Sequence, residues 1–163
     1  EKLNLQSMPR VIECFDISNI GSTYAVGAMV QFRDGVPDKN NYRRFKIKTI
    51  LRRQDDFAMI GEVVRRRYAG LLKRCEEMPD LIVIDGGKGQ LGAAFYELKK
   101  MDIHIPLISL AKKEEEVFFV GAEKPLHISH DNESLKLLQR IRDEAHRFGL
   151  KYHRLLRSKG MLK

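Results

Sequence analysis

The segment Asp80–Leu91, DLIVIDGGKGQL, contains the junction that decides the fold. The continuous apolar run at 81–84 is typical of a strand buried on both faces of a sheet. Asp85 ends this run, glycines follow at 86, 87 and 89, and apolar residues then recur at helical spacing at Leu91, Ala94, Phe95 and Leu98. A strand therefore ends in a carboxylate and passes through a glycine turn into a helix. In open α/β sheets such a junction is a common ligand site.

Composition restricts the class of protein. The chain has 163 residues with 43% hydrophobic and 32% charged residues, which fit one globular domain with a sizeable core. Its net charge of +8 favours a polyanionic partner, nucleic acid foremost, although a solvated basic surface would carry the same charge. Cys14 and Cys75 lack metal-ligand spacing and predict reduced thiols in the cytoplasm. No signal peptide or long apolar span is present, so no membrane association is expected.

The predicted elements follow the order β-β-β-α-β-α-β-α. Strands are expected at 10–18, 24–32, 42–47, 81–84 and 106–110, with a loop at 34–41, a charged loop at 112–116 and a small hairpin formed by 117–120 and 126–128. Three antiparallel strands followed by parallel α/β units predict an α/β fold, with a mixed sheet flanked by helices. We expect residues 1–9 to be a linker, 10–157 one domain, and 158–163 the start of a linker to a further module. A chain without an initial methionine is expected to be a fragment of a longer protein.

Helix boundaries and faces follow from capping residues and periodicity. Asp55 or Asp56 is expected to cap the first helix, and Asp131 the last. The inward face of the first helix is predicted to be Phe57, Ile60, Val64, Tyr68 and Leu71, and that of the last helix Leu135, Leu138, Ile141, Ala145, Phe148 and Tyr152. The arginines at 65–67 are expected on the solvated surface.

Two aspartates are the main candidates for a metal site. Asp16 lies on the same strand face as Ile12 and Cys14, where an unpaired carboxylate would be costly unless it is near the solvated strand end. If the strand of Asp16 neighbours that of Asp85, both carboxylates meet at one sheet edge. Two such groups suit Mg²⁺ or Mn²⁺, with water in the remaining positions.

The glycines of the turn suggest an alternative. Gly87, Gly89 and Gly92 match the dinucleotide-binding pattern G-x-G-x-x-G, which would make the protein an oxidoreductase. However, Asp85 would repel a pyrophosphate, and a ribose-binding acid is expected about 20 residues further on. The next strand ends instead in 109–111, SLA. In either interpretation the glycines provide a tight turn.

The last helix and the basic residues complete the candidate set. Gln139, Asp143, His146 and His153 are expected near one helix face, with the two histidines too far apart to share a metal without another ligand. Candidates for holding a phosphodiester are Arg43, Arg44, Lys48, Lys88, Arg142 and Arg147. Lys88 is the most informative of them because it opens a helix beside Asp85.

Six segments in the same order resemble the C-terminal half of the UvrC family, the bacterial excinucleases of nucleotide excision repair. They are ECFDIS (13–18), YRRFKIK (42–48), DDFAM (55–59), DLIVIDGGKGQL (80–91), LAKKEEE (110–116) and LLQRIRDEAHRF (137–148). The resemblance spans about residues 10–159. It implies a ribonuclease H-like fold and the metal-dependent endonuclease that makes the 5′ incision in damaged double-stranded DNA.

The resemblance also implies roles for particular residues. It implies a catalytic set of Asp16, Asp85 and His146, in which the aspartates hold Mg²⁺ or Mn²⁺ and the histidine acts as a proton-transfer or water-orienting base. A further family aspartate falls at Asp55 or Asp56. The implied partner is a UvrB-type protein that contacts segments outside this chain, where the GIY-YIG nuclease domain and the helix-hairpin-helix module also lie. A non-catalytic DNA-binding module of the same fold is the alternative.

Overall fold

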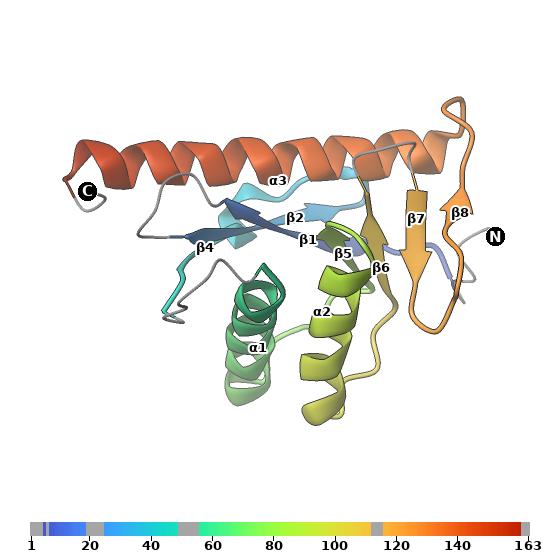
Figure 1. Cartoon of the computed structure of the whole chain (residues 1–163), viewed down its shortest axis with the longest axis horizontal. Coiled ribbons are helices and arrows are strands. Elements are labelled where there is room, and N and C mark those ends of the chain that lie inside the picture. The colour runs from blue at the N-terminus through green and yellow to red at the C-terminus, as the bar shows by residue number, and fades with distance from the viewer. Residues whose placement is uncertain (1–4, 6, 19–24, 49–55, 112–115, 161–163) are drawn as a thin grey trace.

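The protein forms one mixed sheet with helices on both faces (Figure 1). The computed structural model describes residues 5, 7–18, 25–48, 56–111 and 116–160. Its strands are β1 Val11–Ser18, β2 Val26–Arg33, β3 Val36–Pro37, β4 Arg43–Lys46, β5 Leu81–Asp85, β6 Leu107–Leu110, β7 Glu116–Phe119 and β8 Leu126–His127, and its helices are α1 Asp56–Arg74, α2 Lys88–Lys100 and α3 Glu133–Ser158, with a 3₁₀ turn at Lys39–Asn41. The predicted fold class is confirmed.

The strand order is β3-β2-β1-β5-β6-β7-β8. β4 also pairs with β2, through residues 26–29, whereas β3 pairs with residues 32–33 of the same strand. β1, β2 and β4 pair antiparallel, whereas β1, β5 and β6 are parallel, as the sequence predicts. The expected loop at 34–41 was only partly correct because it contains β3. Asp34 and Gly35 both have positive φ (51° and 82°), a conformation that suits a two-residue hairpin turn and lets Phe32 and Arg33 pair with 36–37.

The two faces of the sheet have separate cores. α1 and α2 cover one face, and α3 lies across the other (Figure 1). Alternate residues of β1 divide between them, so that Phe15 packs under α1 and α2 while Ile12 and Cys14 pack under α3. The central strands are apolar on both sides because both sides are buried. In the described part of the chain, no helix has the length and apolar character needed to cross a membrane.

Some helix predictions need correction. α3 is capped by Asn132, whose side chain accepts hydrogen bonds from the backbone N–H groups of Ser134 (2.9 Å) and Leu135 (3.3 Å). The prediction of Asp131 was therefore wrong by one residue, because both residue types can cap a helix. Asp55, the alternative cap of α1, lies outside the described residues, as does the charged segment 112–115. Tyr152 is only half-buried rather than fully inward.

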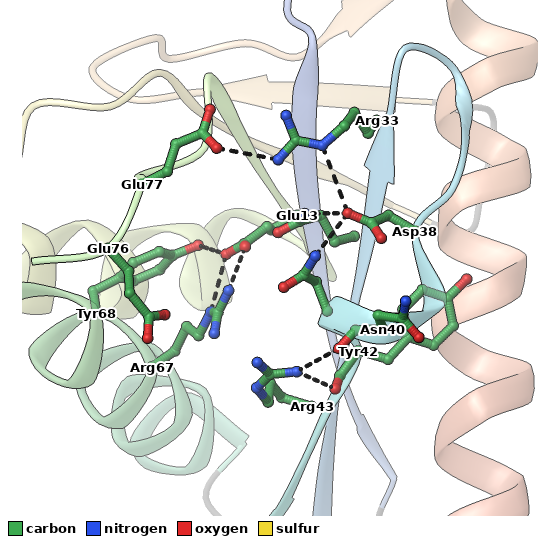
Figure 2. Close-up of polar contacts among 12 residues, drawn as sticks. Glu13, Arg33, Asp38, Asn40, Tyr42, Arg43, Arg67, Tyr68, Glu76 and Glu77 are labelled. Carbon is green, nitrogen blue, oxygen red and sulfur yellow. Dashed lines mark hydrogen bonds and ion pairs between the residues drawn. The ribbon is translucent and has the colours of Figure 1, made fainter. Parts of the chain in front are cut away.

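The prediction for Arg67 was also wrong, since this arginine is buried rather than on the surface. Its Nη2 and Nε donate to the two carboxylate oxygens of Glu13 at 2.7 and 3.3 Å, and the hydroxyl of Tyr68 donates to the same carboxylate at 2.8 Å (Figure 2). Strand alternation places Glu13 on the α1 face of β1. A buried carboxylate needs a charged or hydrogen-bonded partner, which α1 provides.

Arg67→Ala should lower the free energy of unfolding by about 3–5 kcal/mol because it leaves the Glu13 carboxylate buried without its cation. Arg65→Ala, two residues away on the exposed side of α1, should change it by less than about 0.5 kcal/mol. Urea denaturation of both variants measures the difference. Equal stabilities would show that the Glu13–Arg67 pair does not hold α1 on the sheet.

Candidate metal centre

Strand register brings the two candidate aspartates together. In the parallel pairing of β1 with β5, Phe15 lies opposite Ile84. The following residues, Asp16 and Asp85, therefore stand side by side at the carboxyl edge of the sheet. Because Phe15 and Ile84 both point into the core under α1 and α2, the aspartates point to the other face, toward α3.

His146 joins them from α3. Its Nδ1 lies 3.2 Å from Oδ2 of Asp16, and one potential ligand atom from each of Asp16, Asp85 and His146 lies within 4.8 Å of the others. Asp16 is only 5% exposed, whereas the His146 side chain is 49% exposed. The site therefore has a buried carboxylate on its inner side and an imidazole facing solvent. The structure brings together the three residues that the sequence predicted.

Gly149 allows α3 to lie close enough for this contact. A β-carbon at this position would lie 3.4 Å from Cβ of Ala28 and 3.6 Å from Oδ2 of Asp16. The helix thus rests directly on β1 and β2 one turn after His146. The sequence predictions did not include Gly149, whose one local signal is that it is a glycine inside a long amphipathic helix.

The predicted basic residues occupy different environments. Lys88 is exposed and is the first residue of α2, directly after the turn that follows Asp85. The Arg142 side chain is 15% exposed and lies one helical turn before His146. Burial raises the pKa of the Cys14 thiol, the negative charges of Asp85 and Asp16 raise it further, and the positive charge of Arg142 lowers it. The charge of Arg142 therefore acts on Cys14, which precedes Asp16 by two residues on the same face of β1.

Arg43 and Arg44 project to opposite faces of β4. Arg43 donates to the backbone carbonyls of Asn40 (3.1 Å) and Tyr42 (2.8 Å), on the side away from α3 (Figure 2). Arg44 stacks over the rings of Phe148 and Tyr152 on α3, with its guanidinium carbon 4.8 and 5.5 Å from the ring centroids. Of these two arginines, Arg44 is the one that shares the face of Asp16.

Other predicted residues do not join the site. Gln139, Asp143, His146 and His153 lie near one side of the continuous helix α3, as their spacing predicts, but Asp143 is exposed and His153 is buried. Of these four, only His146 belongs to the group of potential ligands. The side chains of Asp55 and Asp56 lie outside the described residues, so their role in the site stays a prediction.

The three converging side chains fit a hard divalent cation. Carboxylate oxygens are the preferred ligands of Mg²⁺ and Mn²⁺, and imidazole is an accepted ligand of transition metals. Donors on opposite sides of an ion bound at about 2.1 Å lie about 4.2 Å apart, which is close to the 4.8 Å span of this set.

The dinucleotide alternative fits less well. The backbone N–H of Gly87, which would face a pyrophosphate in the glycine turn, donates to Oε1 of Gln90 at 3.1 Å. A backbone N–H group of the turn is thus already hydrogen-bonded to a side chain of α2, and the Asp85 carboxylate lies directly before the turn. Both features disfavour an anionic ligand at this position.

A mixed sheet with adjacent carboxylates at two strand ends and a histidine from a covering helix defines a ribonuclease H-like protein with a candidate metal site. The chain belongs to the family described as UvrC RNAse H endonuclease domain, whose model matches residues 1–150. This membership confirms the resemblance inferred from the six segments.

Similar proteins are consistent with the family. UvrABC system protein C of Methanosarcina acetivorans is 57% identical over 162 residues, covering 99% of this chain and 31% of that protein. The corresponding protein of Methanococcus maripaludis has the same identity and coverage. The chain therefore spans less than a third of the length of these relatives. Among solved structures, Ciona intestinalis Endonuclease V in complex with an inosine-containing 24mer DNA matches with a TM-score of 0.50 at 18% identity, covering 85% of this chain and 58% of that one, which supports the fold alone.

Gly149→Leu should lower the free energy of unfolding by about 1–3 kcal/mol and weaken Mn²⁺ binding, because the new side chain pushes α3 away from Asp16. Gly92→Leu is the matched control, since a β-carbon at this position of α2 meets nothing within 4 Å. Urea denaturation and Mn²⁺ calorimetry provide the two measurements. Normal Mn²⁺ binding by a well-folded Gly149→Leu variant would contradict the need for this close approach.

Proposed function

We propose that this chain is the metal-dependent endonuclease domain that makes the 5′ incision in damaged double-stranded DNA during nucleotide excision repair. The observation that carries the proposal is the convergence of Asp16, Asp85 and His146 within 4.8 Å at one sheet edge. Membership in a family described as an endonuclease domain supports it. The relatives named UvrABC system protein C support its place in that repair system.

In this proposal Asp16 and Asp85 hold Mg²⁺ or Mn²⁺. A divalent cation bound there polarises a phosphodiester and lowers the pKa of coordinated water. The carboxylates fix its position because both lie at the ends of strands that are held in the core. We expect Arg142, whose positive charge acts on the neighbouring Cys14, to offset part of the negative charge of the two carboxylates.

His146 then acts on a proton or a water molecule. When its Nδ1 donates to Asp16, its Nε2 is left as a proton acceptor on the half-exposed side of the ring. The Asp16 contact would orient the imidazole, as a carboxylate often does for a histidine base. The competing role, direct metal ligation, would use the same ring and predicts a loss of metal affinity when the ring is removed.

Lys88 and Arg44 are the proposed phosphate contacts on the two sides of the carboxylates. Arg44 lies opposite Ala28 on β2, and Ala28 lies opposite Asp16 on β1. Two strand spacings separate Arg44 from Asp16, or about 10 Å. On the other side, the exposed side chain of Lys88 lies at the start of α2 and offers its ammonium group. Arg43 shares β4 but not this face, so we assign it no phosphate contact near the centre.

The remaining assignments concern the longer protein. We propose that a UvrB-type protein is the partner and binds segments that lie outside this chain. We also propose a cytoplasmic location, which agrees with the free thiols of Cys14 and Cys75.

Asp16→Asn and Asp85→Asn should each abolish incision and weaken Mn²⁺ binding without unfolding the protein, because each removes a charged ligand but keeps its shape. Asp131→Asn, which alters an exposed carboxylate just before α3, should retain both properties. The assay uses the full-length protein with its partner protein, damaged duplex DNA and Mn²⁺. Wild-type protein that binds the DNA but never cuts it would instead indicate a non-catalytic DNA-binding module.

His146→Ala should abolish incision at saturating Mn²⁺ while Mn²⁺ affinity changes by less than about threefold, since a base acts on the proton and not on the ion. Calorimetry gives the affinity, and single-turnover cutting at saturating metal gives the rate. A large loss of Mn²⁺ affinity, with cutting restored by excess metal, would make His146 a ligand instead.

Arg44→Ala should weaken DNA binding and reduce the slope of log affinity against log salt by about 0.9, the value for one lost phosphate contact. Arg44→Lys should restore most of the slope because it keeps the charge. Arg43→Ala is the matched control from the other face of β4 and should leave the slope unchanged. Equal effects of Arg43→Ala and Arg44→Ala would refute the assignment of Arg44 to a phosphate beside the centre.

A further inference from the structure

Phe57 occupies an unexpected position beside the metal centre. The periodicity of α1 predicts that it faces inward, and the other members of that stripe, Ile60, Val64, Tyr68 and Leu71, are buried. Phe57 is instead 51% exposed. The prediction was wrong because the apolar stripe of α1 continues past the edge of the core, so that its first residue stands in solvent.

The ring of Phe57 nevertheless packs against a defined position on α2, Gly89, which we call its seat. A β-carbon on Gly89 would lie 2.3 Å from Cζ and 2.5 Å from Cε1 of Phe57, so only glycine allows the ring to rest against α2 at this point. Glycine inside a helix is less stable than alanine by about 0.5–1 kcal/mol. The contact with Gly89 is made by the distal edge of the ring, while Phe57 as a whole residue is about half exposed.

The position of this seat connects it with the candidate site. Gly89 follows Asp85 by four residues, and an extended chain of four residues spans at most about 14 Å. The exposed Lys88 lies between them at the start of α2. The carboxylate of Asp85, the ammonium group of Lys88 and the Gly89 position that Phe57 contacts thus follow one another from the end of β5 into α2. The ring of Phe57 itself comes from the neighbouring helix α1.

We propose that Phe57 and Lys88 form a nucleotide subsite beside the metal centre, in which Phe57 stacks on an unpaired nucleobase and Lys88 contacts its phosphate. The proposal rests on the proposed function, because it assumes that a DNA strand passes Asp85. Stacking on an aromatic side chain is tolerant of base identity, since every base presents a π-face. A base within an intact duplex is already stacked on both sides, so the subsite selects DNA that is locally unpaired.

Single exposed apolar residues are common on protein surfaces, and Phe95 of α2 is one at 40% exposure. Phe95 lines an apolar groove with Leu98, Ile103 and Leu107. It therefore provides a matched control, a second exposed phenylalanine that is not seated on the turn after Asp85.

The test measures binding without cutting, in the full-length protein carrying Asp16→Asn. The probes are an intact duplex and a duplex with a short unpaired bubble that contains 2-aminopurine, whose fluorescence is quenched when it stacks. Phe57→Ala should lower affinity for the bubble about tenfold and restore fluorescence, with affinity for the intact duplex unchanged. Phe57→Tyr and Phe57→Trp should keep the quenching, whereas Phe57→Leu should behave like Phe57→Ala.

Gly89→Ala supplies a second variant that keeps the ring but displaces it from its seat. It should reduce quenching as Phe57→Ala does, whereas Gly92→Ala and Phe95→Ala should not. Quenching that survives Phe57→Ala, or that is lost equally in Phe95→Ala, would overturn the subsite.

The two proposals can fail separately. A protein with native Asp16 that quenches 2-aminopurine through Phe57 but never cuts DNA would refute the nuclease and leave the subsite intact. Normal cutting, with binding indifferent to Phe57, would refute the subsite alone. Thermal melting of each variant ensures that a lost signal reflects the subsite and not unfolding.

Discussion

The parallel pairing of β1 with β5 in one register is the constraint on which the candidate site depends. A shift by one residue would turn Asp16 to the opposite face of the sheet from Asp85. The register is held by packing on both sides, with Phe15 and Ile84 under α1 and α2, and Cys14 and Val83 under α3. The same apolar residues that specify the core therefore specify where the carboxylates meet.

β1 carries two buried carboxylates, Glu13 and Asp16, whose hydrogen-bond partners differ in charge. Glu13 receives a guanidinium at two points and a hydroxyl, so its charge and its hydrogen-bonding capacity are satisfied within the protein (Figure 2). Asp16, on the other face, contacts the imidazole of His146, which is charged only when protonated. A carboxylate that is nearly buried and has this weaker partner retains the capacity to bind a cation. Glu13 is therefore paired within the protein, whereas Asp16 is a candidate ligand for a cation.

Local patterns were sufficient for the predictions that concern one strand or one turn. The run 81–84, the carboxylate after it and the glycine turn are enough to make Asp85 a candidate site residue. The alternation of side chains along β1 predicts that Glu13 and Asp16 lie on opposite faces of the sheet. The predictions that failed concern residues whose environment depends on tertiary packing, which local sequence does not show. Arg67 lies in a charged run that looks solvated, and nothing local shows that it meets Glu13 across 54 residues. Phe57 follows the helical period correctly, but the period does not show where the sheet beneath it ends. Gly149 matters only because β1 and β2 pass under it.

The arrangement of the proposed contacts restricts how a substrate strand can lie. Arg44, Ala28 and Asp16 follow one another across neighbouring strands, while Lys88 and Phe57 lie beyond Asp85 on the side of α1 and α2. A strand that meets all of them must cross the β-strands at their carboxyl edge instead of running along one of them. Because a base that stacks on Phe57 has left its place in the duplex, a strand on this path would be separated locally from its complement. The two proposals share Lys88, but the nuclease depends on Asp16, Asp85 and His146, whereas the subsite depends on Phe57.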